Sequence, residues 1–355
     1  MRTPSSPRPA RIADVAREAR VSITTVSHVL SGKRPVAAAT RQAVLDAARR
    51  LAYRPTVAAR GLATGRTMAL GLQFPTEGEH LLLNPYFPAL LGSLSAAATQ
   101  DGYSFVLLPA HRSSEFPLES LLEMQRLDAA ILVDPTSTND MLPLLRRYDV
   151  PVVTVGRYLG RHRTHWVDND HPAAILGVLD HLATQGYRRP ALISLAHERY
   201  SYIADIEASY RERMGEAGIE SVVTRAEDLS ERAGYDAAVA LLTRAARPDA
   251  IIAAVDRLAI GVLGAAEELG ISVPDDLGIV GEGDTVLSRN SHPPLTTVDP
   301  RAGELGAQAI AVVRRILDGQ HGDTGPGEMV NVIVKTALIT RQSTERVSPA
   351  PVASP

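Results

Sequence analysis

Hydrophobic positions in the first fifty residues recur every three or four residues, which is the spacing of an amphipathic helix. They predict three short helices, the last of them from 41 to 51. The positions expected to share one core are Ile12, Val15, Ala16, Ala19, Val26, Val29, Leu30, Val44, Leu45, Ala48 and Leu51. Ser22 is expected to cap the second helix, because a serine hydroxyl accepts hydrogen bonds from the free amides at a helix start. Residues 11–53 are therefore predicted to form a small helical domain.

Beyond position 67 the pattern changes to short apolar runs that alternate with longer helical segments. Seven runs have the length of buried strands, the first being MALGLQF (68–74) and the last LGIVGE (277–282). The expected helices include 86–100, 171–185, 233–245 and 256–269. Strands that alternate with helices usually pair in parallel and are covered by the crossover helices, so this part is predicted to be an α/β body.

The composition is that of a globular protein with more than one domain. The chain has 355 residues, of which 45% are hydrophobic and 22% charged, and it contains no cysteine. Disulfides and thiolate metal sites are thereby excluded. No apolar run reaches the roughly 18 residues of a membrane helix, and residues 1–10 lack the apolar segment of a secretory signal. We therefore expect a cytoplasmic protein with a disordered N-terminus over 1–10.

Charge is distributed unevenly along the chain. Residues 1–66 carry 13 Lys/Arg and 3 Asp/Glu, whereas residues 67–355 carry 24 and 37. A basic segment attached to an acidic body fits a DNA-binding domain, because attraction to phosphates supplies most nonspecific affinity for DNA. A solvated basic tail is the alternative, but it does not explain the helical core pattern in the same segment.

The second helix leaves polar side chains on its outer face. Ile23, Thr24, Thr25 and His28 fall near its start and away from the expected core. A recognition helix enters the major groove by its N-terminal end, where threonine contacts a thymine methyl and histidine donates to a purine N7. The first two helices therefore fit a helix-turn-helix.

Several motifs make the resemblance to a family plain. IADVA, VSITTVSHVL, Val36, Thr40-Arg41 and LAYRPTVAARGL resemble the headpiece of the lactose/galactose repressor (LacI/GalR) family. The run TTVSHV is most similar to the purine repressor branch. The resemblance implies further DNA contacts from Ser22, Ser27, Arg41 and Tyr53. Two residues depart from the pattern: Arg20 replaces a frequent turn glycine, and Ser31 replaces a frequent asparagine. We expect Arg20 to adopt a turn geometry other than the left-handed one.

Residues 54–62 match the hinge segment of the same family, and a hinge helix with its linker is expected over 54–66. Pro55 is suited to a helix start, and Ala58, Ala59 and Leu62 share one face, but so short a helix is unstable alone in water. The resemblance implies that two hinges pair on the minor groove, with contacts from Ala59, Arg60 and Leu62. Leu62 would wedge into the central base step, as leucine does in other minor-groove proteins. A plain linker is the alternative.

The resemblance extends over residues 11–341 and implies a body of two lobes, like a periplasmic binding protein. We expect an N-lobe over about 67–164 and 293–326 and a C-lobe over about 165–292 and 327–341. The chain would cross between the lobes near 165, 293 and 327. Residues 342–355 are rich in Ser and Pro and are expected to be disordered.

Ligand is expected in the cleft between the lobes. The candidate effector-binding residues are Asn84, Tyr86, Phe87, Arg157, Tyr200, Tyr202, Asp256 and Asp284. Structural roles compete with this assignment, since Asp256 would equally cap helix 257–269, and Tyr86 and Phe87 would equally be core. Three family positions are altered, with Val255 for Asn, Gly283 for Asp and Ile206 for Arg. The effector is therefore not a typical hexose or nucleobase, or the cleft uses other groups, or it is vestigial.

Motifs for catalysis and cofactors are missing from the sequence. There is no P-loop, no G-x-S-x-G and no H-E-x-x-H, so we expect neither an enzyme nor a cofactor. His162, His165, Asp168, Asp170 and His171 are close in sequence, but they span a loop, a strand and a helix start. Their side chains are expected to diverge, so no metal site is predicted.

These features favour a dimeric transcriptional regulator, most simply a repressor, that binds a palindromic operator and is controlled by a small molecule such as a sugar or another metabolite. Two half-sites require a two-fold dimer. Other functions remain open: a solute-binding receptor without a DNA role, an activator, a regulator without a small-molecule effector, and an enzyme on the same scaffold.

Overall fold

The computed structural model describes residues 10–31, 34–53, 66–75, 84–110, 118–124, 127–195, 200–319 and 329–346. The chain divides into two compact units, residues 1–69 with 120–128, and residues 70–119 with 129–355. Residues 10–53 are called the headpiece below. The two lobes of the second unit are called the body. Residues 1–9 of the expected disordered start (1–10) and residues 54–65 of the expected hinge and linker (54–66) lie outside the described residues.

The headpiece consists of three helices around a small apolar core. They are α1 (Ile12–Ala19), α2 (Ile23–Ser31) and α3 (Ala38–Arg50). The buried core residues are Val15, Ala16, Val26, Val29, Val44, Ala47 and Ala48. The predicted pattern is confirmed, with Leu30, Leu45 and Leu51 packed at the core's margin. The third helix begins three residues earlier than its predicted start at position 41, so Thr40 lies inside it.

The turn between α1 and α2 corrects one expectation. Arg20 does adopt the left-handed conformation, with φ 52° and ψ 42°. The reason is a hydrogen-bonded helix end: the Val21 amide donates to the Ala16 carbonyl over 3.0 Å, and the Arg20 amide donates to Arg17 over 3.2 Å. This end needs one left-handed residue, which glycine adopts without the steric cost that Arg20 bears.

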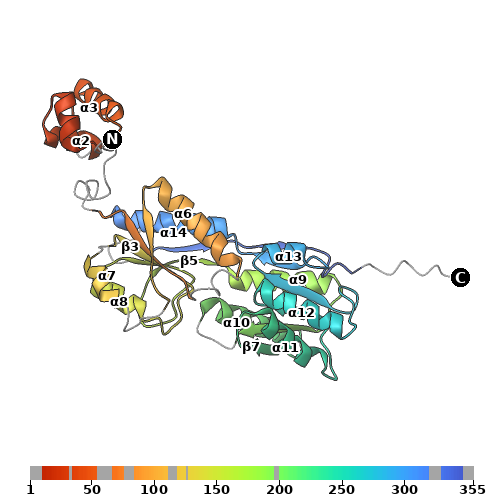
Figure 1. Ribbon diagram of the computed structural model, residues 1–355. Coiled ribbons are helices and arrows are strands. Elements are labelled where there is room, and N and C mark those ends of the chain that lie inside the picture. The colour runs from red at the N-terminus through yellow and green to blue at the C-terminus, as the bar shows by residue number, and fades with distance from the viewer. Residues whose placement is uncertain are drawn as a thin grey trace, which may run out of the picture. The chain divides into compact units, whose positions relative to one another are not determined.

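In the body, the first sheet has the strand order β11-β5-β4-β3-β1-β2. Its strands are β1 (Ala69–Gln73), β2 (Ser104–Leu107), β3 (Ala129–Val133), β4 (Val152–Val155), β5 (His165–Asn169) and β11 (Asn331–Val334). The pairs β1–β3, β3–β4, β4–β5 and β5–β11 are parallel. Helices α6 (Tyr86–Gln100) and α14 (Ala302–Leu317) lie side by side in this lobe (Figure 1), which also includes α8 (Met141–Arg147). A short helix, α7 (Leu118–Met124), precedes β3.

The second sheet has the strand order β12-β10-β9-β8-β6-β7. Its strands are β6 (Pro190–Leu195), β7 (Val222–Ala226), β8 (Ala250–Ala253), β9 (Gly278–Glu282), β10 (Thr296–Asp299) and β12 (Ala337–Ile339). Only the β10–β12 pair is antiparallel among the strand pairings described. The helices of this lobe are α9 (His171–Thr184), α10 (Ser201–Glu216), α11 (Glu231–Leu242), α12 (Asp256–Glu268) and α13 (Val286–Asn290).

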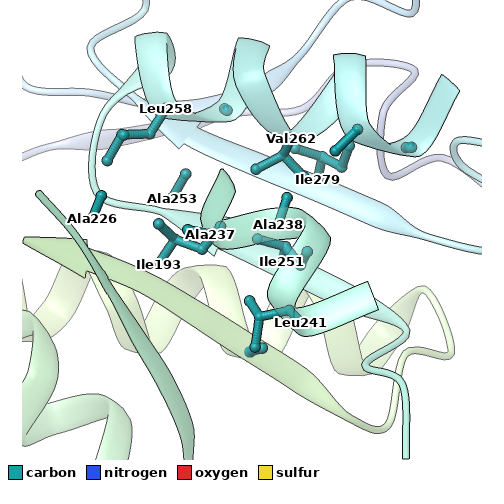
Figure 2. Close-up of a cluster of buried hydrophobic side chains, with 14 of the residues drawn as sticks. Ile193, Ala226, Ala237, Ala238, Leu241, Ile251, Ala253, Leu258, Val262 and Ile279 are labelled. Carbon is teal, nitrogen blue, oxygen red and sulfur yellow. The ribbon is translucent and has the colours of Figure 1, made fainter. Parts of the chain in front are cut away.

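The core of the second lobe shows why its helices pack so closely. Figure 2 shows Ala237, Ala238, Leu258 and Val262 of α11 and α12 against Ile193, Ile251 and Ile279 of the sheet. A Cβ at Gly261 would lie 2.0 Å from the Glu231 carbonyl oxygen, and one at Gly234 would lie 2.3 Å from that of Leu258. Glycine at both positions therefore lets the two helix backbones touch. Helices α9 and α10 cover the other face of the sheet, around Leu192 and Tyr210.

The points at which the chain crosses between the lobes differ from those expected. Strand β5 pairs in the first sheet and β10 in the second, so the crossings follow residues 169, 299 and 334. The expected crossings near 165, 293 and 327 are each four to seven residues early. The family motifs mark the strands themselves, and the chain can change lobe only after each strand has completed its ladder.

The prediction that the chain is disordered from residue 342 onward is wrong for residues 342–346. Residues 342–346 are folded, and Ser343 and Thr344 are fully buried. The Ser343 hydroxyl accepts from the Thr296 amide over 2.8 Å and donates to the Ile279 carbonyl over 2.6 Å. Arg346 lies 3.9 Å from the centre of the Tyr187 ring. Polar residues are ordered here because strands β9 and β10 provide hydrogen-bond partners that composition cannot reveal.

All seven apolar runs contain a strand, and the four expected helices are α6, α9, α11 and α12. The predicted fold class is confirmed: a helical headpiece followed by two α/β lobes with mainly parallel sheets. No helix in the described part of the chain is both long and apolar enough to cross a membrane.

Candidate DNA-binding surface and ligand-binding cavity

The N-terminal end of α2 is an exposed surface on a well-packed base. Val26 and Val29 are buried in the headpiece core, whereas Ile23 keeps 52% of its surface exposed and Thr24 is also exposed. Ile23 is a large apolar side chain, so its exposure has no folding benefit. The helix therefore has one face fixed by packing and a start available for contacts.

Hydrogen bonds hold this helix start in place. The Ser22 hydroxyl accepts from the Thr25 amide over 3.1 Å, which confirms the predicted cap, and it lies 2.9 Å from the Thr25 hydroxyl. Thr25, Ser27 and His28 are half-buried. The predicted contact residues from 22 to 28 thus comprise three exposed residues at the helix start (Ser22, Ile23 and Thr24) and three half-buried ones.

The headpiece also carries several exposed basic side chains. Arg17, Arg49 and Arg50 form ion pairs with Asp14, Asp46 and Glu18. Arg34 and Arg41 are exposed, and neither has an acidic partner within the described residues. Exposed guanidinium groups without an acidic partner are suited to phosphate contacts.

The remaining predicted DNA contacts are less accessible or fall elsewhere. Tyr53 packs at the margin of the headpiece core, and burial raises the pKa of its hydroxyl. Ala59, Arg60 and Leu62 lie outside the described residues.

A cavity opens in the body at the carboxyl ends of strands from both sheets. Its empty volume is about 610 Å³, including solvent at its mouth. Residues at or just after the ends of β3, β4, β5, β8 and β9 line it, together with the start of α6. Ligands of open α/β folds bind outside the carboxyl ends of strands, so the cavity has the location expected for a ligand site.

Four of the eight predicted effector-binding residues line the cavity: Asn84, Tyr86, Phe87 and Tyr202. The Asn84 side chain accepts from the Tyr86 amide over 3.2 Å, and the Tyr86 and Phe87 rings are 5.5 Å apart. Tyr200 does not line the cavity, but its ring lies 5.7 Å from that of Tyr202, which does. The cavity therefore has an aromatic wall with a polar rim.

Asp256 and Asp284 do not line the cavity, because their carboxylates are engaged by other residues. Asp256 is buried, and its carboxylate accepts from the Thr285 amide and hydroxyl, both over 2.8 Å, and from the Thr297 hydroxyl over 2.6 Å. Asp284 pairs with Arg289 and Arg341, which lowers its pKa although burial opposes them. Asp256 is the first residue of α12, whose cap is Val255, so the alternative capping role is not observed either.

Arg157 lies just behind the cavity wall. Its guanidinium donates to Asp168 over 3.2 Å and also pairs with Asp205. The guanidinium is thus engaged by two carboxylates and is not itself part of the lining. Its role is to hold Asp168 in position.

An acidic cluster on the lining was not predicted as an effector site. It comprises Asp134 after β3, Asp168 in β5, Glu282 at the end of β9 and His171 at the start of α9. Nε2 of His171 lies 3.1 Å from Asp168, and its Nδ1 lies 3.7 Å from Glu282. Although burial opposes protonation, these carboxylates raise the pKa of His171 to about 9.

The other members of the acidic cluster are also perturbed. Burial, reinforced by the charge of Asp168, raises the pKa of Asp134 to about 7. Burial also raises the pKa of Glu282, and the charge of His171 opposes it. Strongly perturbed groups that converge in a cavity are typical of functional sites. Asp134 has φ 42°, and such backbone strain in a non-glycine residue is also concentrated at functional sites.

A signal for the acidic cluster was present in the sequence. Asp134, Asp168 and Glu282 each stand at the carboxyl end of an apolar run, where parallel strands deliver side chains to one edge. In the sequence, Asp168 and His171 stand out only as possible metal ligands, and no grouping fit to hold a metal exists among the described residues.

Comparison with known proteins gives two family matches. Residues 11–56 match the family described as bacterial regulatory proteins, lacI family, and residues 179–344 match the periplasmic binding protein-like domain.

Curated relatives are similar over nearly the whole length. The chain is 30% identical to the HTH-type transcriptional regulator CelR of Thermobifida fusca, covering 93% of this chain and 96% of that protein. It is 29% identical to catabolite control protein A of Priestia megaterium, covering 88% and 94%. It is 28% identical to the transcriptional repressor PurR of Haemophilus influenzae, covering 95% and 99%. Such similar identities do not assign the chain to the purine branch or to any other.

Solved structures agree in fold. A lac repressor dimer bound to operator and the anti-inducer ONPF superposes with a TM-score of 0.74 at 25% identity, covering 95% of this chain and 99% of that one. A complex of the regulator CelR with cellobiose superposes with a TM-score of 0.72 at 26% identity, covering 94% and 99%.

Proposed function

The chain belongs to the LacI family of bacterial regulatory proteins, and we propose from this premise that it is a cytoplasmic repressor that binds a palindromic operator as a homodimer. A small molecule in the cavity of the body controls this binding. The protein is a DNA-binding regulator and not an enzyme, so the cavity is a receptor site.

The observation that carries the proposal is the start of α2. Ser22 fixes this helix end, Ile23 and Thr24 are exposed on it, and the opposite face is sealed in the core. This is the arrangement by which a recognition helix enters the major groove. Thr24, Thr25 and His28 read base edges, while Arg34 and Arg41 bind phosphates. Leu62 contacts the centre of the site.

Homodimerisation is supported by an apolar groove on the second lobe. Ile260, Leu263 and Ile271 line it together with Val286 and Pro293. Val286 keeps 56% of its surface exposed at the start of α13. A second copy of the chain covers this groove, because a palindromic site requires a two-fold protein. The relative solved with operator is also a dimer.

Control by effector follows from the position of the cavity between two lobes that are linked by three crossings. A ligand that binds one lobe arrangement more tightly shifts the population of dimers toward it. The spacing of the two headpieces then changes, and with it the affinity for two half-sites. The CelR structure that superposes on this chain was solved with a small molecule, cellobiose.

The proposal is tested by capturing DNA from the source genome. The purified full-length chain is mixed with sheared genomic fragments near physiological salt, and retained fragments are sequenced. We expect enrichment of a short palindrome whose neighbouring genes are the regulated ones. A variant lacking residues 1–66 is the matched control, since it retains the cavity and the groove but lacks the headpiece.

Enrichment that is equal with and without residues 1–66 would contradict a headpiece that reads DNA. Absence of enrichment, both alone and with extract of the source cells added as a supply of corepressor, would contradict the proposed operator binding. Enrichment of a site without two-fold symmetry would contradict the dimer. Transcription from a promoter carrying the captured site distinguishes a repressor from an activator.

A further inference from the structure

The net charge of the cavity lining indicates which class of effector it can bind. Among the described residues that form the lining, Asp134, Asp168 and Glu282 carry carboxylates and His171 is the only basic group. An arginine lies close by, but Arg157 is paired with Asp168 and Asp205. The lining therefore has an excess of negative charge that no neighbouring guanidinium is free to balance.

Two of the carboxylates have no hydrogen-bond donor. Asp168 is satisfied by His171 on one oxygen and by Arg157 on the other. In contrast, neither Asp134 nor Glu282 accepts a side-chain hydrogen bond within the described part of the chain, and the nearest cationic atom to Glu282 is 3.7 Å away. A carboxylate withdrawn from water is unfavourable unless it is paired. Within the described residues, Asp134 thus has no ion-pair partner, and Glu282 has only the distant contact of 3.7 Å with His171.

His171 contributes a second unsatisfied group. Its ring is buried, with 5% of the residue exposed, and it lines the cavity. Nε2 is bonded to Asp168, whereas Nδ1 is buried and has no hydrogen-bond partner. With Nε2 bonded to a carboxylate, a protonated Nδ1 is a donor. It is suited to an oxygen acceptor at 2.7–3.2 Å.

The missing positive partner is organic and not a metal ion. Nowhere in the described residues do three acidic or histidine side chains converge as metal ligands. The opposite wall is aromatic, formed by Tyr86, Phe87 and Tyr202. Aromatic rings pack against the carbon skeleton of a ligand and attract an ammonium to their faces. The cavity therefore matches an ammonium, a carbon skeleton and an oxygen acceptor in one molecule.

We propose that the effector is a small hydroxylated amine, whose ammonium is held by Asp134 and Glu282 and whose oxygen accepts from Nδ1 of His171. This inference rests on the proposed function, since it names the class of ligand for the same cavity. The lining excludes phosphorylated and carboxylated metabolites, because a further anion beside three carboxylates is repelled.

The test uses calorimetric titration of the full-length chain at pH 7 with matched compounds. The amines are D-glucosamine, D-galactosamine and D-mannosamine, each compared with its N-acetyl derivative and its parent hexose. Within each set only the substituent at carbon 2 differs, and only the amine carries a positive charge. We expect at least one amine to bind at least ten-fold more tightly than both counterparts. Amines that bind no more tightly than their counterparts, including no binding by any compound, would overturn the proposal.

Substitutions locate the amine. Asp134→Asn and Glu282→Gln keep the shape of the lining and remove one charge each, so each is expected to weaken amine binding about ten-fold. Neutral compounds are expected to be unaffected. Glu216→Gln, at an exposed position in α10, is the matched control. Circular dichroism verifies that each variant is folded. Amine binding unchanged in both folded variants would overturn the assignment.

The ligand-free protein provides a readout that needs no ligand. Asp134→Asn removes an unpartnered charge, so it is expected to raise the melting temperature at pH 8, whereas Glu216→Gln leaves it unchanged. A lowered melting temperature would show that the Asp134 charge already has a partner and would overturn the proposal.

The capture experiment separates this inference from the proposed function. If a palindrome is captured but no amine binds to the protein, the proposed DNA-binding function stands and only the amine effector is overturned. Amine binding without any captured operator would support the cavity assignment and contradict the DNA-binding role.

Discussion

Nδ1 of His171 lies 3.7 Å from Oε1 of Glu282, although the first residue begins helix α9 and the second ends strand β9. On the other side of the ring, Nε2 lies 3.1 Å from Asp168. One imidazole is thus placed between carboxylates from two different sheets. The arrangement joins the two lobes electrostatically at the cavity floor.

This imidazole is expected to make stability depend on pH. The pKa of His171 is raised in the folded state to about 9 from the usual 6.5. Its stabilising contribution is therefore fully present below pH 6.5 and is lost as the pH rises through 9. The shift corresponds to a contribution on the order of 3 kcal/mol. Thermal melts of the wild type and His171→Gln are expected to converge between pH 6.5 and 9; a constant difference would show that His171 does not titrate in this way.

Asp256 is expected to act in folding and not in ligand binding. Asp256→Ala leaves the Thr285 amide and two hydroxyls without an acceptor, which is expected to cost about 3 kcal/mol. Asp236→Ala, which removes an exposed ion pair with Arg232, is expected to change stability by less than about 0.5 kcal/mol. Urea unfolding measures both. Equal effects would argue against the buried hydrogen bonds of Asp256.

Replacing the left-handed residues of the headpiece with glycine is expected to raise its stability. Arg20 and Ala52 have φ of 52° and 47° at the ends of α1 and α3. Arg20→Gly and Ala52→Gly are each expected to stabilise the headpiece by about 1 kcal/mol. Arg17→Gly, inside α1, is expected to destabilise it by a similar amount. Hydrogen exchange of the Val26 and Val44 amides measures whether each variant stabilises or destabilises the headpiece. Destabilisation by all three substitutions would contradict the turn geometry.

His28 is expected to discriminate one base pair in each half-site. His28→Ala should reduce the preference at that position by about 1–3 kcal/mol and leave the other positions unchanged. Arg41→Ala should instead weaken binding to all sequences and lower the salt dependence by about one phosphate contact. Competition binding to a library of operator variants measures the two effects. An unaltered base preference in His28→Ala would refute the proposed docking of α2.

Val286 is expected to support the dimer. Val286→Arg places a charge in the apolar groove, so sedimentation should shift toward the monomer while the melting curve of the body remains cooperative. Leu159→Arg is the control, since Leu159 is similarly exposed, at 46%, but lies outside the groove. A dimer that withstands the charge at position 286 would place the interface elsewhere.

Local periodicity predicted the elements that bury one strong face. Val15, Val26 and Val44 mark the headpiece core because their helices are amphipathic. Strands such as Ala129–Val133 are visible because they are buried on both faces. Strand β7 was not predicted, since Val222 and Val223 are only half-buried at a sheet edge.

Cavity residues were harder to predict because tertiary packing assigns carboxylates to different tasks. Asp256 and Glu282 both adjoin apolar strands, yet threonine hydroxyls take up Asp256 while Glu282 faces the cavity. Which carboxylate meets a partner depends on Thr285 and Thr297, far away in the sequence. Motif resemblance alone selected Asp256 and passed over Glu282.

The three crossings after residues 169, 299 and 334 have a consequence for biosynthesis. The first lobe needs β11 and the second needs β12 with Ser343, so both sheets remain incomplete until almost all of the described chain has left the ribosome. Neither lobe corresponds to a continuous stretch of the gene. Truncated products therefore cannot contribute a working half-receptor, and a premature stop late in the coding sequence would damage both lobes at once.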